Sequence, residues 1–253
     1  MNQSYEARDA AGAEAASVLA EPRAGDCVFD DVETAIAAIS RGEFVLVVDD
    51  EHRENEGDLI IAADAVTSEQ LAFLVRHTSG IVCISLPGEV LDRLQLPLMV
   101  QDNRESHQTA FTVSLDCRHG TTTGVSAADR ACTLRALADH TATAADFVRP
   151  GHVFPLRCRD GGVLARPGHT EAAHDLVKLA GRPPGGVLCE LVNDDGTMAR
   201  RPELFRFAAK HGLAIITITQ LIEYRVRMQH RVDCERSGRI RETGIEGLAI
   251  WRA

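Results

Sequence analysis

Between residues 30 and 228, short apolar runs alternate with helical patterns, and this alternation is the feature that most constrains the fold. The run at 44–48 is continuously apolar and has the length of a strand, which favours a strand buried on both faces. Before it, apolar residues recur at helical spacing from Val32 to Ile39, and Gly42 predicts the helix end. Further strands are expected at 59–61, 81–86, 111–115, 152–158, 187–192 and 214–218. One further helix is expected to begin at the capping box of Thr67 and Gln70. Other helices are expected at 126–138, 170–180 and 202–211, and a last one begins at Gln220.

The turn sequence Asp160-Gly161-Gly162 indicates a hairpin between a strand at 152–158 and a second one at 163–165. A hairpin makes the sheet mixed rather than purely parallel, and no linker interrupts the alternation. The chain is therefore predicted to be one domain of α/β class, in the α+β style, with a mixed sheet flanked by helices in three layers. We expect this domain at 27–230, between a disordered N-terminal tail at 1–26 and a polar C-terminal tail at 231–253.

Charge and cysteine usage exclude several classes of protein. The net charge of −10 argues against nucleic-acid and anionic-membrane partners, which favour basic surfaces. Seven cysteines without a C-x-x-C pair argue against a disulfide framework or a zinc-finger site, and favour reduced thiols in a cytoplasmic protein. No apolar run reaches the roughly 18 residues of a membrane span, and the N-terminus does not resemble a secretory signal.

The segment at 49–58, DDEHRENEGD, follows the apolar run at 44–48 and is the first candidate site. If it is extended, Glu54, Glu56 and Asp58 share one face, because side chains alternate along a strand. Three carboxylates so close would raise one another's pKa, and a divalent cation or a bound polyol would relieve the repulsion. The alternative is a solvated acidic loop.

A second candidate site is Arg166-Pro167-Gly168-His169-Thr170, which precedes an expected helix. Thr170 suits the N-cap position, and the free N–H groups of a helix start can bind an anion that Arg166 would also grip. The alternative is an ordinary capped turn. The motif is echoed at 149–152, and the expected hairpin would bring His152 and His169 to the same end of a ribbon, although a chance echo is equally open.

Two further features could contribute to a site. The loop at 120–124, Gly-Thr-Thr-Thr-Gly, leads into a helix, but it lacks the lysine of a nucleotide-binding loop and could be a plain cap. Glu190 lies inside an apolar strand, where it either faces solvent or, if buried, acquires a raised pKa that suits a general acid or base. Cys83, in contrast, is expected to be a core thiol.

Together these stretches resemble one family, the 3,4-dihydroxy-2-butanone 4-phosphate synthases. The resemblance spans roughly residues 30 to 228, and no single motif carries it alone. It rests on DDEHRENEGD at 49–58, HTSGIVC at 77–83, TTGVSAADR at 122–130, RPGHVFPL at 149–156, GGVLARPGHTEA at 161–172 and GVLCELVNDDGTMAR at 186–200.

The resemblance implies a metal-dependent lyase that converts D-ribulose 5-phosphate to 3,4-dihydroxy-2-butanone 4-phosphate and formate, a step of riboflavin biosynthesis. It implies Mg²⁺, with Mn²⁺ also possible, and a cytoplasmic homodimer with a shared active site that includes His152. No second, GTP cyclohydrolase II domain is expected. The implied metal ligands are Glu54 and His169, the implied catalytic residues are Glu56, Asp58, His152 and Glu190, and the implied substrate contacts are Arg53, Glu54, Asp58, Thr123, Arg166, Pro167, Gly168, His169, Thr170 and Glu190.

Two alternatives remain beside this interpretation. A non-catalytic homologue could keep the fold and bind a sugar phosphate as a sensor. An enzyme could also use the same site on a different sugar phosphate, and comparing turnover across pentose phosphates separates that alternative from the main interpretation.

Overall fold

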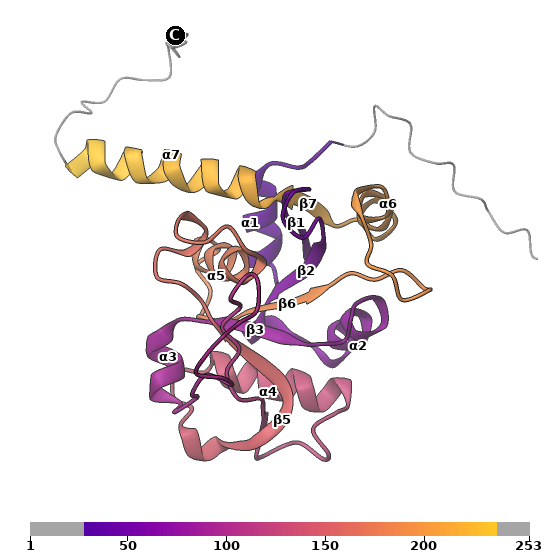
Figure 1. The fold of residues 1–253 in the computed structure, drawn as a ribbon, viewed down its shortest axis with the longest axis vertical. Coiled ribbons are helices and arrows are strands. Elements are labelled where there is room, and N and C mark those ends of the chain that lie inside the picture. The colour runs from indigo at the N-terminus through magenta and orange to yellow at the C-terminus, as the bar shows by residue number, and fades with distance from the viewer. Residues whose placement is uncertain (1–27, 237–253) are drawn as a thin grey trace, which may run out of the picture.

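A computed structural model describes residues 28–236, and Figure 1 shows their arrangement. The tails expected at 1–26 and 231–253 lie outside the described residues, except for 231–236, which belong to the last helix. Among the helices of the described part, none has the length and apolar character needed to cross a membrane.

One mixed sheet of seven strands forms the centre of the described domain, in the order β4-β5-β3-β6-β2-β1-β7. The pairs β1–β7 and β3–β5 are parallel, whereas β1–β2, β2–β6, β3–β6 and β4–β5 are antiparallel. The strands are β1 (Val45–Val48), β2 (Gly57–Ala62), β3 (Cys83–Leu86), β4 (Leu115–Cys117), β5 (Phe147–Arg157), β6 (Gly186–Glu190) and β7 (Ala214–Thr217).

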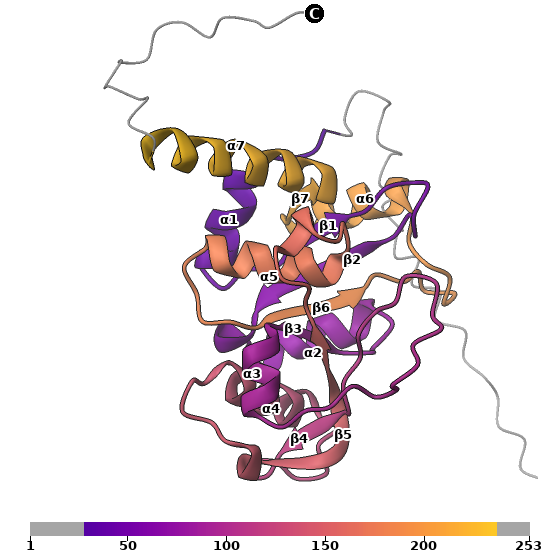
Figure 2. The ribbon, with the colours of Figure 1, turned by 60° about the vertical axis from the view of Figure 1, so that its left-hand side comes forward.

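Helices cover both faces of the sheet, as Figures 1 and 2 show, so the predicted three-layer mixed-sheet architecture is confirmed. The continuous apolar pattern of β1 follows from this: Leu46 and Val48 belong to one buried core, and Val45 and Val47 belong to the other. The helices are α1 (Val32–Ser40), α2 (Ser68–His77), α3 (Gly88–Arg93), α4 (Ala127–Ala138), α5 (His169–Leu179), α6 (Arg201–His211) and α7 (Ile218–Arg236).

The helix start predicted at Thr67 is confirmed in detail. The Thr67 hydroxyl accepts from the Gln70 N–H at 3.2 Å, and the Gln70 side chain accepts from the Thr67 N–H at 3.0 Å. The box satisfies two N–H groups that would otherwise lack partners at the start of α2. Local sequence therefore determines where this helix begins.

The hairpin predicted at 160–162 is wrong. Residues 162–164 form a short 3-10 turn, and β5 pairs instead with β3 and β4. Gly162 has φ +65°, and a Cβ there would lie 2.2 Å from a carboxylate oxygen of Asp175. That carboxylate accepts the Val163 N–H at 2.9 Å, so the glycine pair turns the chain onto α5 rather than back along the sheet.

The strand expected at 111–115 is also displaced, because β4 occupies Leu115–Cys117. Phe111 forms only an isolated bridge with Leu156, and Thr112 donates its N–H to the Pro155 carbonyl at 2.9 Å. Proline has no N–H to return such a bond. The segment at 111–114 therefore forms no continuous ladder with this part of β5, which pairs with β3 on its other side.

Candidate active site

Asp49 organises the acidic loop that joins β1 to β2. Its carboxylate is buried and accepts the backbone N–H groups of Glu54 at 3.0 Å and Glu56 at 2.8 Å, together with an Arg53 N–H at 3.0 Å. The chain turns at 51–54, and Asn55 has φ +55°, so the segment becomes extended only at β2. The single extended face considered from the sequence does not form, but Glu54 and Asp58 still point to a common place.

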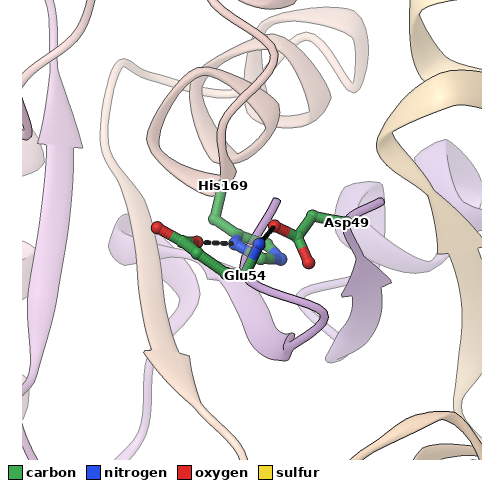
Figure 3. Close-up of side chains that lie close together, drawn as sticks. All are labelled: Asp49, Glu54 and His169. Atoms are coloured by element: carbon green, nitrogen blue, oxygen red, sulfur yellow. Dashed lines mark hydrogen bonds and ion pairs between the residues drawn. The ribbon is translucent and has the colours of Figure 1, made fainter. Parts of the chain in front are cut away.

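Glu54 and Asp58 both face the imidazole of His169, the first residue of α5. Its Nε2 lies 3.2 Å from the Val47 carbonyl, and its Nδ1 lies 3.5 Å from Glu54 Oε2 and 3.7 Å from Asp58 Oδ1. A carbonyl only accepts, so we assign a proton to Nε2, and Nδ1 is the ring nitrogen that faces the carboxylates and gives up its proton when the imidazole becomes neutral. Figure 3 shows His169 reaching from the start of α5 toward Asp49 and Glu54.

The cluster is strongly charged for a buried site. Burial raises the pKa of Asp58 to about 8, and the carboxylates of Glu190 and Glu54 add to this effect. Burial alone would lower the pKa of His169, but the charges of Asp58 and Glu54 outweigh it and raise this pKa to about 9. Burial likewise opposes ionisation of Glu54, yet His169 and Arg53 lower its pKa to about 2.

These donors fit a hard divalent cation. Ligand atoms of Asp49, Glu54 and His169 lie within 4.8 Å of one another, and Asp58 Oδ1 is buried without a hydrogen-bond partner among residues 28–236. Both oxygens of Asp49 already accept loop N–H groups, so Glu54 and His169 are the freer donors. Carboxylate oxygens with one imidazole suit Mg²⁺ or Mn²⁺, and the Val47 carbonyl supplies the outer contact that orients the imidazole.

Metal affinity is expected to increase as the pH rises toward about 9. At neutral pH the metal-free His169 is protonated, because its pKa is raised to about 9, and a cation at Nδ1 must displace that proton. Below that pKa, affinity should increase about tenfold per pH unit for each proton released. Calorimetric titration of Mg²⁺ in buffers of different ionisation enthalpy counts the released protons. Equal affinity at pH 6.5 and 8.5 would contradict this prediction.

Other predicted site residues surround this cluster. Asp58 and Glu190 are paired positions on β2 and β6, and the Glu190 carboxylate accepts the Ser79 hydroxyl at 2.6 Å. Glu190 is half-buried rather than enclosed. The pKa of Glu56 is raised by burial and by the Glu54 charge, while Arg200 lies 3.8 Å away.

The start of α5 differs from the sequence expectation. The N-cap is Gly168 rather than Thr170, because Gly168 takes the extended conformation and the helix begins at His169. Within the described part of the chain no side chain caps α5, so its first N–H groups remain available to an anion. Arg166 lies beside this end, but its guanidinium already donates to Glu171 at 2.7 Å and to the His107 carbonyl at 3.1 Å.

His152 belongs to a separate group with Asp116, beside the loop at 120–124 that contains Thr123. Asp116 accepts the His152 backbone N–H at 2.8 Å and faces the ring Nδ1 at 2.7 Å, and Nδ1 lies 2.9 Å from where a Cβ on Gly124 would be. Strands β3 and β6 separate β5 from β2, a span of roughly 14 Å at normal strand spacing. His152 and His169 are therefore not brought together by a hairpin within one chain, contrary to the ribbon argument.

Three contacts could not be anticipated from local sequence. Asp116 orients His152, Ser79 holds Glu190, and His107 approaches Glu54 from a loop far along the chain. The sequence signal for Asp116 is an aspartate placed directly after the strand expected at 111–115. Cys83 is buried with a raised pKa caused by burial, as a core thiol should be.

Fold and site together define the class: a three-layer α/β protein with a buried, carboxylate-rich cation site at the ends of neighbouring strands. Comparison with known proteins then identifies the family, because the model of the 3,4-dihydroxy-2-butanone 4-phosphate synthase family matches residues 33–224. This chain belongs to the 3,4-dihydroxy-2-butanone 4-phosphate synthase family.

Individual relatives agree with this assignment. The chain is 60% identical over 193 residues to the 3,4-dihydroxy-2-butanone 4-phosphate synthase of Agrobacterium fabrum. This match covers 76% of this chain and 91% of the relative. It is 54% identical over 213 residues to the riboflavin biosynthesis protein RibBA of Mycobacterium tuberculosis, covering 83% of this chain but only 50% of that relative.

Solved structures show the same fold. A 3,4-dihydroxy-2-butanone 4-phosphate synthase in complex with two magnesium ions matches with a TM-score of 0.77 and 46% identity, over 79% of this chain and 99% of that one. The Candida albicans enzyme matches with a TM-score of 0.73 and 50% identity, over 78% of this chain and 98% of that one.

Proposed function

We propose that this protein is a metal-dependent lyase that converts D-ribulose 5-phosphate to 3,4-dihydroxy-2-butanone 4-phosphate and formate, a step of riboflavin biosynthesis. The observation that carries the proposal is the cluster of Glu54, Asp58 and His169, found in a chain of this family with donors that suit Mg²⁺ or Mn²⁺. We further propose that it works in the cytoplasm as a homodimer with a shared site.

In this proposal Glu54 and His169 hold the cation, which when bound supplies Lewis-acid polarisation of the substrate oxygens. Arg53 fixes Glu54 through a 2.5 Å ion pair and adds positive charge beside the substrate. Asp58, whose pKa is raised to about 8, is suited to exchange a proton with a substrate hydroxyl near neutral pH. Glu56 and Glu190 flank it as further proton carriers, and their order of action is not assigned.

The phosphate is proposed to lie at the uncapped start of α5. Pro167 and Gly168 bring the chain into that end, and Thr170 is buried in the first turn. The helix N–H groups favour an anion there, and Arg166 stands beside them. The Arg166 guanidinium now donates to Glu171 and to the 107–109 segment, so a hydrogen bond to phosphate would come from the same group.

His152 lies on β5, three strand spacings from β2, and this supports the proposal that it acts in the site of a partner subunit, together with Thr123 of the neighbouring loop at 120–124. Asp116 faces Nδ1 of His152, which leaves Nε2 for proton exchange with the substrate. The shared site then explains why a catalytic imidazole stands 46% exposed in one chain.

The proposed function is tested by formate release. Purified protein with D-ribulose 5-phosphate and Mg²⁺ should release one formate per substrate consumed, and EDTA should stop it. No formate from folded, metal-loaded dimer would refute the lyase and favour the non-catalytic sugar-phosphate-binding homologue. Faster turnover of another pentose phosphate would point instead to an enzyme with a different substrate.

Asp116→Asn is expected to lower kcat by about 10²-fold, because an amide cannot hold the His152 tautomer as a carboxylate does. The substitution changes how the His152 imidazole is positioned, not how the substrate binds, so KM should change little. The pH profile of kcat should shift as well, which a merely structural role would not cause. A wild-type kcat and pH profile in the folded Asp116→Asn protein would show that His152 acts without Asp116.

A further inference from the structure

The segment at 103–109, between α3 and β4, forms a loop that is bonded to itself. The Asn103 side chain donates to the Thr109 carbonyl at 2.9 Å, and the Glu105 carboxylate accepts the backbone N–H groups of His107 at 2.8 Å and Thr109 at 3.0 Å. These bonds fix the backbone on both sides of His107. The loop therefore determines the direction in which the His107 side chain leaves the backbone.

Arg166 attaches this loop to the start of α5. Its guanidinium donates to the His107 carbonyl at 3.1 Å and to the Thr109 hydroxyl at 3.1 Å, while its other end pairs with Glu171. In Figure 2 the segment between α3 and β4 rises from the β4 end of the domain alongside β5. The attachment brings His107 beside the proposed phosphate position.

The imidazole of His107 faces the outer oxygen of Glu54. Nε2 lies 3.7 Å from Glu54 Oε1, whereas Oε2 faces inward to Arg53 and His169. At 3.7 Å the two atoms do not form a hydrogen bond to each other. A single oxygen atom can nevertheless lie about 2.8 Å from both, which is a normal hydrogen-bond distance.

We propose that His107 is a substrate-binding residue, whose Nε2–H and the Oε1 of Glu54 together hold one hydroxyl group of the bound sugar phosphate. A pentose phosphate with its phosphate at the start of α5 extends its carbon chain past Arg166 toward Glu54, which places a hydroxyl at this position. His107 is 34% exposed, so the ligand can reach it. The inference rests on the proposed function, because it names a further contact for the same substrate.

His107 acts on the sugar and not on the metal. It does not belong to the group of donor atoms formed by Asp49, Glu54 and His169. The imidazole donates the hydrogen bond, so glutamine, which also carries an N–H at the end of its side chain, should replace it in part. Leucine fills a similar volume but offers no donor.

The test compares His107→Leu and His107→Gln with His140→Gln, a control at an imidazole that is 96% exposed. We expect His107→Leu to raise KM for D-ribulose 5-phosphate about tenfold, the loss of one hydrogen bond. His107→Gln should stay within about threefold of wild type, and the calorimetric affinity for Mg²⁺ should be unchanged in all three variants.

An unchanged KM in His107→Leu would overturn the proposal, as would equal losses in the leucine and glutamine variants or a parallel loss of Mg²⁺ affinity. If the wild-type protein releases no formate, the proposed function fails by itself. Calorimetric titration of D-ribulose 5-phosphate into wild type and His107→Leu still decides the inference in that case: weaker binding to the variant supports it, and equal or absent binding overturns it.

Discussion

Glu54→Gln is expected to reduce magnesium-dependent formate release by about 10³-fold, because it removes the charge of a carboxylate donor that, unlike Asp49, accepts no backbone N–H group among the described residues. The carboxylate now carries an ionic contact to Arg53 at 2.5 Å and faces His169 Nδ1 at 3.5 Å. A glutamine keeps the shape but offers one neutral oxygen, so the affinity for Mg²⁺ should fall with the rate. Formate release and calorimetric Mg²⁺ titration measure the two effects on the same protein.

Glu51→Gln is the matched control for this variant. Glu51 lies in the same loop, is 57% exposed and pairs with Arg201 rather than with the cluster. It should retain wild-type turnover and metal affinity. If Glu54→Gln kept the wild-type rate while folded, the cation would have to be held by other residues, and the assignment of Glu54 as a ligand would be wrong.

Asp58→Asn should also reduce turnover by about 10³-fold, because it removes a buried group suited to proton exchange near neutral pH. Asp58 is 2% exposed, and its Oδ1 has no hydrogen-bond partner among the described residues. An amide neither takes up nor releases a proton. Formate release measures the loss, and Asp194→Asn, in an exposed turn, serves as the control.

The same variant should stabilise the metal-free protein at high pH. The pKa of Asp58 is raised from 3.8 to about 8, so the folded state holds a proton that the unfolded state has lost, and stability falls as the pH rises through this interval. His169 adds a loss of the same sign up to about pH 9. Urea unfolding at pH 6 and pH 9 should show a smaller decline for Asp58→Asn, and an identical decline would mean that Asp58 is ionised throughout.

Local sequence patterns predicted much of the fold, because they show which faces of a segment must be buried and which N–H groups at a helix start must be capped. The apolar run at 44–48 contains β1, which is buried on both faces, and the pattern at Thr67 and Gln70 is the capping box of α2. The hairpin at 160–162 failed because Asp175, from α5, captures the Val163 N–H. Turn residues show that the chain bends there, but not in which direction.

For the site, the sequence by itself determined the family, the acidic loop at 49–58 and the turn into α5 that presents His169. It could not show that Asp49 folds this loop, that His107 faces Glu54, or that His152 is held by Asp116 far from His169. Those arrangements depend on contacts between distant segments, such as His169 and Val47, which lie 122 positions apart. Tertiary structure alone decided them, because strand order and loop packing, rather than neighbouring residues, bring such groups together.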